Sequence, residues 1–591
     1  MMQIKKLLPR LGAGFLAASI LTVSATPAMA AGRYNDYNTI VNGINLAVPQ
    51  KLAICKPSGN ITSAVGSYYI TGTSNPNQPL YMDGTAVEGR GRNGSFGAYV
   101  TLSPGANTFT FTQGNQSSSV TITYNTQGGY STTNSVTKMT PQYDSGYEGG
   151  STLSLSCVAP SGSRVTATLG GVTVQLGQVA AAMDGVPARF KGEITIPGVS
   201  AVTNLGPITY TLTWQGSTKN IPSAGNIYGV PKGGTMLVQV IDTSSNLYPD
   251  GETETSFLTT AKKGAIDAVI DQNDLRYKLA MGGWINKDTV KPLTGGTNQN
   301  TVSGVGFSST VWGERYKFSG TTNPMTTTSR SGNKLSITLH HTSGIASVPT
   351  GQSKLFGSAS VTQQGDDTVI EFTLAQGKSL WGYTIEYADG VTTLYCKYPA
   401  TLSGNANLPL SNIIVALDAG HGGVDSGALG PTGQSGPMEK DITAATALAL
   451  KRRLQSLGAT VIYSAPGEGK TNLTARMQPA HDQKADLYLS LHCNSVAGNG
   501  LKPSGTEIYY YEDIAKPFAQ VLQKNLVAAT GRNNRGSKFS NYRVTLNTLA
   551  PAVLVEMGFV SNPVEYDELC SNDVIYTTVN AIADGILEFL A

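Results

Sequence analysis

The pattern of hydrophobic and polar positions changes once along this chain, near residue 411. Before that point, short runs of β-forming residues recur between turns rich in Gly, Asn and Pro, as in 107–112 and 334–341. After it, apolar strands alternate with longer helical stretches. Closely spaced short strands are typical of β-sandwiches, whereas strands that alternate with helices favour a parallel sheet covered by helices. We therefore expect N-terminal all-β modules followed by one α/β domain, with a mainly parallel sheet flanked by helices, at 411–591.

Four β modules are predicted ahead of the α/β domain. Residues 47–124 and 149–224 each show short strands at the spacing of a sandwich, and we interpret them as tandem immunoglobulin-like modules. Residues 226–295 include a Gly-Gly-Trp-Ile run at 282–285 that resembles the closing hairpin of bacterial SH3-like wall domains. Residues 300–400 form a further β-rich module. A chain of 591 residues is long enough for this number of cores.

Within 411–591 the alternation is regular. The helical stretch that begins at Glu439 places Ala447, Leu450 and Leu454 on one stripe, and Gly458 is a natural residue to end it. The pattern predicts helices at 439–457, 471–484, 513–530 and 572–590, and strands at 413–418, 460–464, 486–492, 505–511 and 551–556.

The first thirty residues have the three parts of a secretory signal peptide. Basic residues (Lys5, Lys6 and Arg10) precede an apolar run at 11–23, which is followed by a small-residue Ala-Met-Ala cleavage site. The apolar run is short for a membrane span. No later segment is apolar for long enough to cross a bilayer. We expect residues 1–30 to be a signal peptide and the protein to be secreted, without a membrane span.

Charge and cysteine content argue against two classes of protein. The chain has 41 Lys and Arg against 38 Asp and Glu, and loss of three cations with the signal peptide leaves 38 of each. A neutral chain in which charged residues make up only 13 % offers no basic surface for nucleic acid. Five cysteines, an odd number spread along the chain, are not the pattern of a disulfide framework.

Two histidines stand where apolar strands end. The strand at 413–418 leads into a glycine-lined turn with His421, and the strand at 487–491 leads directly into His492. Sites in parallel α/β sheets are built at the carboxyl ends of strands. Glu439 opens a helix, so its carboxylate can point to the same edge. Because hydrolytic zinc sites use imidazole and carboxylate ligands and keep one open position, we predict that His421, Glu439 and His492 bind Zn²⁺.

A fourth candidate, Glu556, follows a run of apolar residues at 551–555. A carboxylate in such a strand is costly to bury without a partner. One interpretation is a structural ion pair with an arginine such as Arg543. The other is a general base, or an electrostatic partner, for a zinc-activated water. Burial raises the pKa of such a carboxyl, and an adjacent cation lowers it.

Five motifs in this region, taken in order, resemble the zinc-dependent N-acetylmuramoyl-L-alanine amidases of the α/β type. The resemblance covers 413–591 and implies zinc on His421, Glu439 and His492, with Glu556 as the catalytic acid. It also implies cleavage of the amide between muramic acid and the first L-alanine of the peptidoglycan stem peptide. The β-rich module at 300–400 is similar in position to the wall-targeting module of some relatives. The motifs are Asp418-Ala-Gly-His-Gly-Gly423, Glu439-Lys-Asp441, Ser490-Leu-His-Cys-Asn494, Gly505-Thr-Glu507 and Pro551-Ala-Val-Leu-Val-Glu-Met-Gly-Phe-Val-Ser-Asn562.

The expected function is therefore that of a secreted, cell-wall-associated peptidoglycan hydrolase whose β modules hold it on the wall. Two alternatives stay open. One is a wall-binding or adhesive protein with an inert amidase-like domain, although all four key residues are intact. The other is a different zinc peptidase or deacetylase of the wall, which would release an amine inside the stem peptide, or acetate, instead of a free N-terminal L-alanine. The oligomeric state is not indicated.

Overall fold

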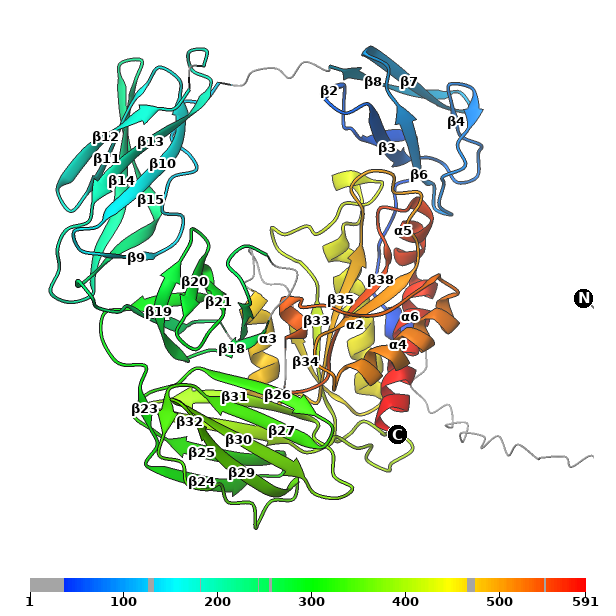
Figure 1. The fold of residues 1–591 in the computed structure, drawn as a ribbon. Helices are drawn as coiled ribbons and strands as arrows, with labels where there is room; N and C mark the ends of the chain where they lie inside the picture. Colours follow the sequence, from blue (N-terminus) through cyan, green and yellow to red (C-terminus); the bar gives the residue numbers. More distant parts are fainter. Residues whose placement is uncertain are drawn as a thin grey trace, which may run out of the picture.

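The chain is mostly β, with a helix-containing domain at its C-terminal end. The computed structural model describes residues 37–125, 132–180, 182–242, 244–253, 258–464, 473–546 and 549–591, so the signal peptide predicted at 1–30 lies outside the described residues. Figure 1 shows β units that follow one another beside the C-terminal domain. In the part of the chain that the structure describes, no helix combines the length and the apolar character that a membrane crossing requires.

The first β unit packs two sheets around a small core. Ile70, Phe96, Phe111 and Ile122 are buried in it, and the rings of Phe96 and Phe111 lie 4.8 Å apart. One sheet has the order β1 (Ala53–Lys56), β3 (Ser67–Thr73), β6 (Ser95–Thr101). The other has the order β2 (Ile61–Ser63), β8 (Gln116–Tyr124), β7 (Gly105–Gln113), β4 (Tyr81–Met82), β5 (Thr85–Ala86).

The second β unit is a seven-stranded sheet that curls around its own core. Buried and exposed residues alternate along β10, as expected for a strand with one face in a core. Phe190 and Tyr210 are among its largest buried side chains. The strand order is β10 (Thr152–Pro160), β13 (Pro187–Thr195), β12 (Val172–Gln178), β11 (Arg164–Leu169), β14 (Thr203–Trp214), β15 (Ser217–Val230), β9 (Ser145–Glu148).

The third unit is another seven-stranded sheet, and the fourth is built from two four-stranded sheets. The third has the order β18 (Thr259–Lys262), β17 (Ser244–Tyr248), β21 (Trp284–Asn286), β20 (Arg276–Leu279), β19 (Ile266–Gln272), β16 (Leu237–Val240), β22 (Val290–Leu293). In the fourth, the first sheet is β24 (Gly304–Ser309), β25 (Gly313–Ser319), β32 (Val391–Lys397), β31 (Gly382–Ala388). Its second sheet is β26 (Thr326–Ser331), β27 (Lys334–Leu339), β30 (Asp367–Leu374), β29 (Phe356–Gln364), and a short pair joins β23 (Asn300–Thr301) to β28 (Thr342–Ser343).

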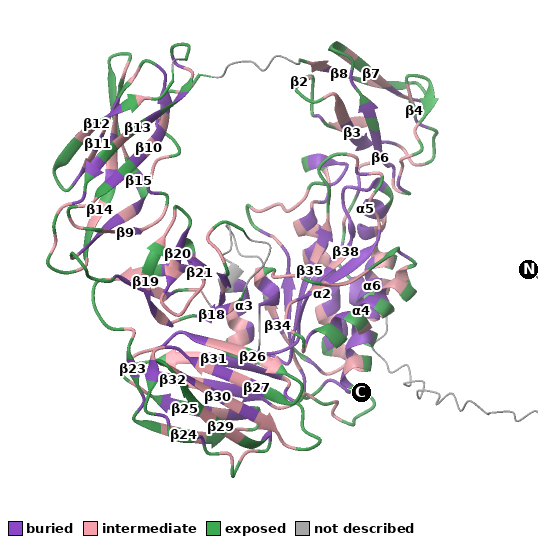
Figure 2. Ribbon diagram, in the orientation of Figure 1, coloured by how far each residue is buried: buried purple, intermediate pink, exposed green. Residues whose placement is uncertain are grey.

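The C-terminal domain contains a six-stranded sheet whose central strands β33, β35 and β38 are buried, with helices around it (Figure 2). All neighbouring strands pair in parallel except β36 and β38, which are antiparallel. The order is β34 (Thr460–Ser464), β33 (Ile414–Ala419), β35 (Leu487–Asn494), β38 (Ala552–Phe559), β36 (Thr506–Tyr510), β37 (Asn534–Phe539). The helices are α2 (Glu439–Ser456), α3 (Leu473–Asp482), α4 (Lys516–Thr530), α5 (Pro563–Leu569) and α6 (Asn572–Leu590).

Helix α2 follows directly from its sequence pattern. Ala447, Leu450 and Leu454 recur at helical spacing and are fully buried against the sheet. The helix ends before Gly458, which has φ +95°, a backbone conformation that favours glycine. The predicted stripe and stop signal of this helix are thus both present.

Among the α-helices and strands that the structure describes in the C-terminal domain, β37, α5 and α1 were not predicted. Helix α1 (Tyr37–Val41) comes from the far N-terminal end of the described chain and packs on α2 and α6. Its Ile40 and Val41 are buried in the same core as the strands of the domain. A five-residue helix has too little periodicity to be recognised in a sequence. The domain core therefore includes residues far outside 411–591.

The first β unit is attached to the C-terminal domain at α5 (Figure 1). The buried carboxylate of Asp567 accepts hydrogen bonds from the backbone N–H of Asn93 at 2.6 Å and of Ser95 at 3.3 Å. The hydroxyl of Tyr69 donates to the carbonyl of Ser561 at 3.2 Å. Since these bonds involve buried groups on both sides, the first β unit and the domain form one packed assembly.

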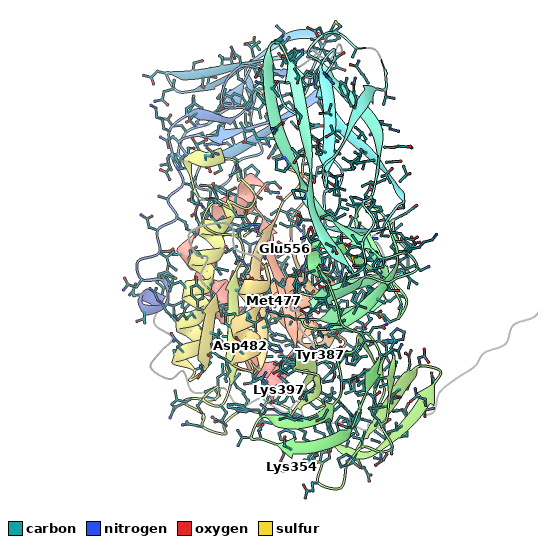
Figure 3. All side chains as sticks on the ribbon, turned by 90° about the vertical axis from the view of Figure 1, so that its left-hand side faces the viewer. Lys354, Tyr387, Lys397, Met477, Asp482 and Glu556 are labelled. Carbon is teal, nitrogen blue, oxygen red and sulfur yellow. The ribbon has the colours of Figure 1, made fainter. Side chains whose placement is uncertain are left out.

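The fourth β unit meets the C-terminal domain at a buried ion pair, and Figure 3 labels its lysine at this junction. Lys397 Nζ lies 2.7 Å from Asp486 Oδ1, and the two side chains are 2 % and 6 % exposed. Asp486 also accepts the backbone N–H of Ile414 at 2.8 Å, and its carbonyl accepts the indole N–H of Trp381 at 2.8 Å. The pair thus links the β unit to the first strand of the domain.

Lys397→Met is expected to destabilise this junction, because it leaves the carboxylate of Asp486 buried without its cation. Removing one partner of a buried ion pair typically costs about 3–5 kcal/mol. Urea unfolding followed by tryptophan fluorescence reports on the junction, since Trp381 lies in it. Lys51→Met, at an exposed position, serves as the control. An unchanged unfolding midpoint for Lys397→Met would contradict the assigned role of the pair.

Candidate metal centre

Three side chains from three elements converge at one edge of the C-terminal sheet. His421 follows β33, Glu439 is the first residue of α2, and His492 lies near the end of β35. Their possible ligand atoms all lie within 4.8 Å of one another. Glu439 Oε1 is 3.1 Å from both His421 Nε2 and His492 Nδ1. The structure therefore brings together the three residues that the sequence predicted as metal ligands.

A buried polar network fixes the turn that carries His421. This residue has φ +63°, an uncommon conformation for a histidine. Arg476 donates to Asp418 Oδ1 at 2.9 Å and to the carbonyl of Ala419 at 2.6 Å, and it also bonds the carbonyl of His421. Ser490 donates to the other oxygen of Asp418 at 2.7 Å. These bonds hold the left-handed turn in place.

Two glycines make room for the cluster. A Cβ on Gly420 would lie 2.4 Å from His492 Cε1. A Cβ on Gly427 would lie 2.7 Å from Glu439 Oε2, and Gly427 also has φ +63°. Any side chain at these two positions would displace a member of the cluster, which explains why the turn after β33 is rich in glycine.

The cluster is electrostatically coupled. Glu439 is 4 % exposed, and its two oxygens accept the backbone N–H of Ala428 at 2.8 Å and of Cys493 at 3.1 Å. Burial raises the pKa of Glu439, but hydrogen bonds to the two histidines outweigh it and hold that pKa well below its usual range. Burial lowers the pKa of His421, while hydrogen bonds to Glu439 and Asp425 raise it to about 9. These side chains therefore favour a positive charge at the position between them. A metal ion and the protons of the histidines would compete for that position.

Sequence reasoning missed Asp425 and Arg476. Asp425 Oδ2 lies 3.0 Å from His421 Nδ1 and can orient the ring by accepting its hydrogen bond. The spacing of four residues from His421 was the available signal for Asp425. Arg476 lies on α3, 55 residues from the His421 carbonyl that it bonds, and no local pattern connects them.

Glu556, labelled in Figure 3, lies on β38, where it is the Cα partner of His492 in the parallel pair with β35. Its Oε2 is buried and has no hydrogen-bond partner among the described residues. Burial raises the pKa of Glu556 to about 7; His492 lowers it, and Glu439 and Glu507 raise it. Arg543, considered as its ion-pair partner, instead pairs with Asp242 of the third β unit. The structure thus leaves Glu556 with an unpaired, half-buried carboxylate.

The donor set suits a catalytic metal. Two imidazoles and one carboxylate match the protein ligands of hydrolytic zinc sites. No cysteine side chain and no further histidine side chain belongs to this cluster among the described residues. All five cysteines are free, and Cys493, next to His492, is buried. His481 contacts Thr384 and lies near Glu386 of the fourth β unit, away from the cluster.

Comparisons with known proteins point to one family. The family model described as N-acetylmuramoyl-L-alanine amidase matches residues 415–588. The probable cell wall amidase LytH of Staphylococcus aureus is 36 % identical over 180 residues, which are 30 % of this chain and 58 % of that protein. This chain thus matches little more than half the length of that curated relative.

Solved structures also match the C-terminal domain. The catalytic domain of CwlV, an N-acetylmuramoyl-L-alanine amidase from Bacillus (Paenibacillus) polymyxa var. colistinus, is 36 % identical; the match covers 30 % of this chain and 98 % of that one, with a TM-score of 0.29. The amidase AmiC2 of Nostoc punctiforme is 28 % identical, over 31 % of this chain and 98 % of that one, with a TM-score of 0.29. Each of these matches covers about a third of this chain or less.

Proposed function

Because this chain belongs, through residues 415–588, to the N-acetylmuramoyl-L-alanine amidase family, we propose that it hydrolyses peptidoglycan. The bond cleaved is the amide between N-acetylmuramic acid and the L-alanine of the stem peptide. The observation that carries this proposal is the convergence of His421, Glu439 and His492 beside the unpaired carboxylate of Glu556.

Zinc is the metal proposed for this centre, held by His421, Glu439 and His492. When bound, zinc lowers the pKa of water to about 7 and polarises the scissile carbonyl. The protein contributes the orientation of the ligands. Asp425 accepts the hydrogen bond of the His421 ring, and the backbone N–H groups of Ala428 and Cys493 fix the carboxylate of Glu439.

Glu556 is proposed as the proton carrier of the reaction. Its free Oε2 can accept a proton from the attacking water as the new carbon–oxygen bond forms. The same proton can then be given to the nitrogen of L-alanine as the carbon–nitrogen bond breaks. A carboxyl with a pKa near neutrality is suited to both steps, since it can exist in either form at working pH.

The place of action is proposed to be the cell wall outside the membrane. The signal-peptide pattern at 1–30 supports export, and the name of the Staphylococcus aureus relative supports a role at the wall. The β units are proposed to bind wall polymers, with immunoglobulin-like folds for the first two and an SH3-like fold for the third. The packing of the first and fourth units onto the domain would hold the catalytic centre close to whatever these units bind.

Digestion of purified peptidoglycan with end-group analysis tests this function. The mature protein is expected to release N-terminal L-alanine, to stop doing so with a chelator, and to recover with added zinc. Acetate or an amine from inside the stem peptide would point to a different zinc hydrolase. No product from a zinc-loaded protein would contradict the proposal and favour a binding role for the β units.

Activity is expected to fall on the acid side of neutrality. Only the ionised carboxylate of Glu556 can accept a proton, and burial raises the pKa of this group to about 7. A bound cation would lower this pKa, so the midpoint should lie between the ordinary pKa of glutamate and about 7, with the rate falling about tenfold per pH unit beneath it. The profile of kcat/KM against pH checks this. A rate unchanged down to the ordinary pKa of glutamate would contradict it.

A further inference from the structure

A second carboxylate, Glu507, stands in line with the catalytic centre. In the sheet, Glu556 is the Cα partner of His492 on one side and of Glu507 on the other. Directly paired residues on neighbouring strands project from the same face of a sheet. His492, Glu556 and Glu507 therefore form one row across β35, β38 and β36, and the proposed function did not use Glu507.

Glu507 is fully engaged by its neighbours. Its side chain is 2 % exposed. Oε1 accepts hydrogen bonds from Asn494 Nδ2 at 2.6 Å and from the hydroxyl of Tyr509 at 2.8 Å. Oε2 accepts from Arg535 Nε at 2.8 Å and from Lys538 Nζ. A carboxylate with four donors has no free lone pair with which to act as a base. Its role is to hold Arg535 and Lys538 in place.

The two cations on β37, Arg535 and Lys538, are paired with Glu507 but remain partly exposed. The side chains of Arg535 and Lys538 are 36 % and 39 % exposed. Arg535 bonds Glu507 through Nε, and within the described residues its two Nη groups have no hydrogen-bond partner. Its guanidinium lies 4.9 Å from the ring centre of Phe559, and Lys538 Nζ lies 5.7 Å from that of Tyr509. These contacts pre-position both groups, and two cations against one carboxylate leave a net charge of +1.

Resting on the proposed function, we infer that Arg535 and Lys538 form an anion-binding subsite for a carboxylate of the stem peptide. In peptidoglycan the acetylated sugars are neutral, and the lactyl carboxyl is consumed in the scissile amide. The negative charges close to that bond are thus the carboxylates of the peptide. A guanidinium with two free Nη groups can bind a carboxylate in two-point fashion, which an uncharged carboxamide cannot match. The subsite therefore selects peptides whose residue after L-alanine carries a free carboxylate.

The test uses two muramoyl peptides that differ only in a carboxylate or a carboxamide on the residue after L-alanine. The mature full-length enzyme is expected to favour the acid in kcat/KM by about tenfold to a hundredfold, the range for a hydrogen bond to a charged group. Lys538→Met and Arg535→Met should reduce this ratio toward one, and Lys538→Arg should restore most of it. Lys524→Met, an exposed lysine paired with Glu588, should leave it unchanged.

The ratio separates recognition from structural damage, because a disturbed fold lowers both rates together. Equal rates for the two peptides with the unmodified enzyme, or an unchanged ratio in both Met variants, would overturn the subsite while leaving the amidase function intact. If the enzyme hydrolyses neither peptide, calorimetry measures the binding of the corresponding free peptides instead. Tighter binding of the acid that is lost in Lys538→Met would support the subsite even without hydrolysis, and equal binding would overturn it.

Discussion

Glu556→Gln is expected to lower kcat by about 10²–10⁴-fold, the usual contribution of a positioned acid–base group. The amide of glutamine has nearly the same shape as the carboxyl but cannot take up and release the proton of the attacking water. The proposed metal ligands His421, Glu439 and His492 are unchanged, so the variant should still bind zinc. Kinetics on purified peptidoglycan and metal analysis of the same preparation measure both quantities.

The matched control is Glu588→Gln, which removes an exposed carboxylate of α6 that pairs with Lys524 of α4. It should retain both activity and zinc. The acid limb of the pH profile should also disappear from whatever activity remains in Glu556→Gln. Full activity in this variant would remove Glu556 from the mechanism, and loss of zinc would show that it supports the metal instead.

His421→Ala is expected to abolish both metal binding and activity. The substitution removes one of three proposed ligands and leaves the carboxylate of Glu439, 3.1 Å from His421 Nε2, with a single histidine neighbour. Without the metal, the protein loses the source of its nucleophile, so the rate should drop by about 10³-fold or more. Mass-spectrometric metal analysis and product analysis check the two losses separately.

His481→Ala is the control for this variant, since His481 belongs to the same domain but contacts Thr384 of the fourth β unit. It should keep its zinc. Chelation of the unmodified protein should reproduce the inactivity of His421→Ala, and only the chelated protein should recover on addition of zinc. An active His421→Ala variant that binds no metal would refute a metal-dependent reaction at this centre.

Much of the candidate centre could be predicted from the sequence because its signals are local. An apolar run that stops at a histidine, a helix that begins at Glu439 and glycines around a sharp turn each involve neighbours a few residues apart. The stripe of Ala447, Leu450 and Leu454 is equally local, and the structure has the helix where the stripe predicted it. The change from short strands to alternating strands and helices located the C-terminal domain.

The environment of Glu556 shows where such reasoning stops. The sequence left open an ion pair with Arg543, only thirteen positions away. In the structure that arginine turns to Asp242, three hundred residues earlier, and the carboxylate of Glu556 is left unpaired. The pairing of cations with carboxylates depends on how units distant in the chain pack together. The periodicity of the sequence does not predict that packing.

The sequence by itself thus determined most of the helices and strands of the C-terminal domain and the three residues that could hold a metal ion. The tertiary structure alone decided that His492, Glu556 and Glu507 share one row, that α1 completes the core, and that Asp567 anchors the first β unit. The physical reason is the separation along the chain between the residues that make contact. Helix and strand patterns arise from contacts between close neighbours, whereas strand register and domain packing are set by the burial of surfaces that are far apart in the chain.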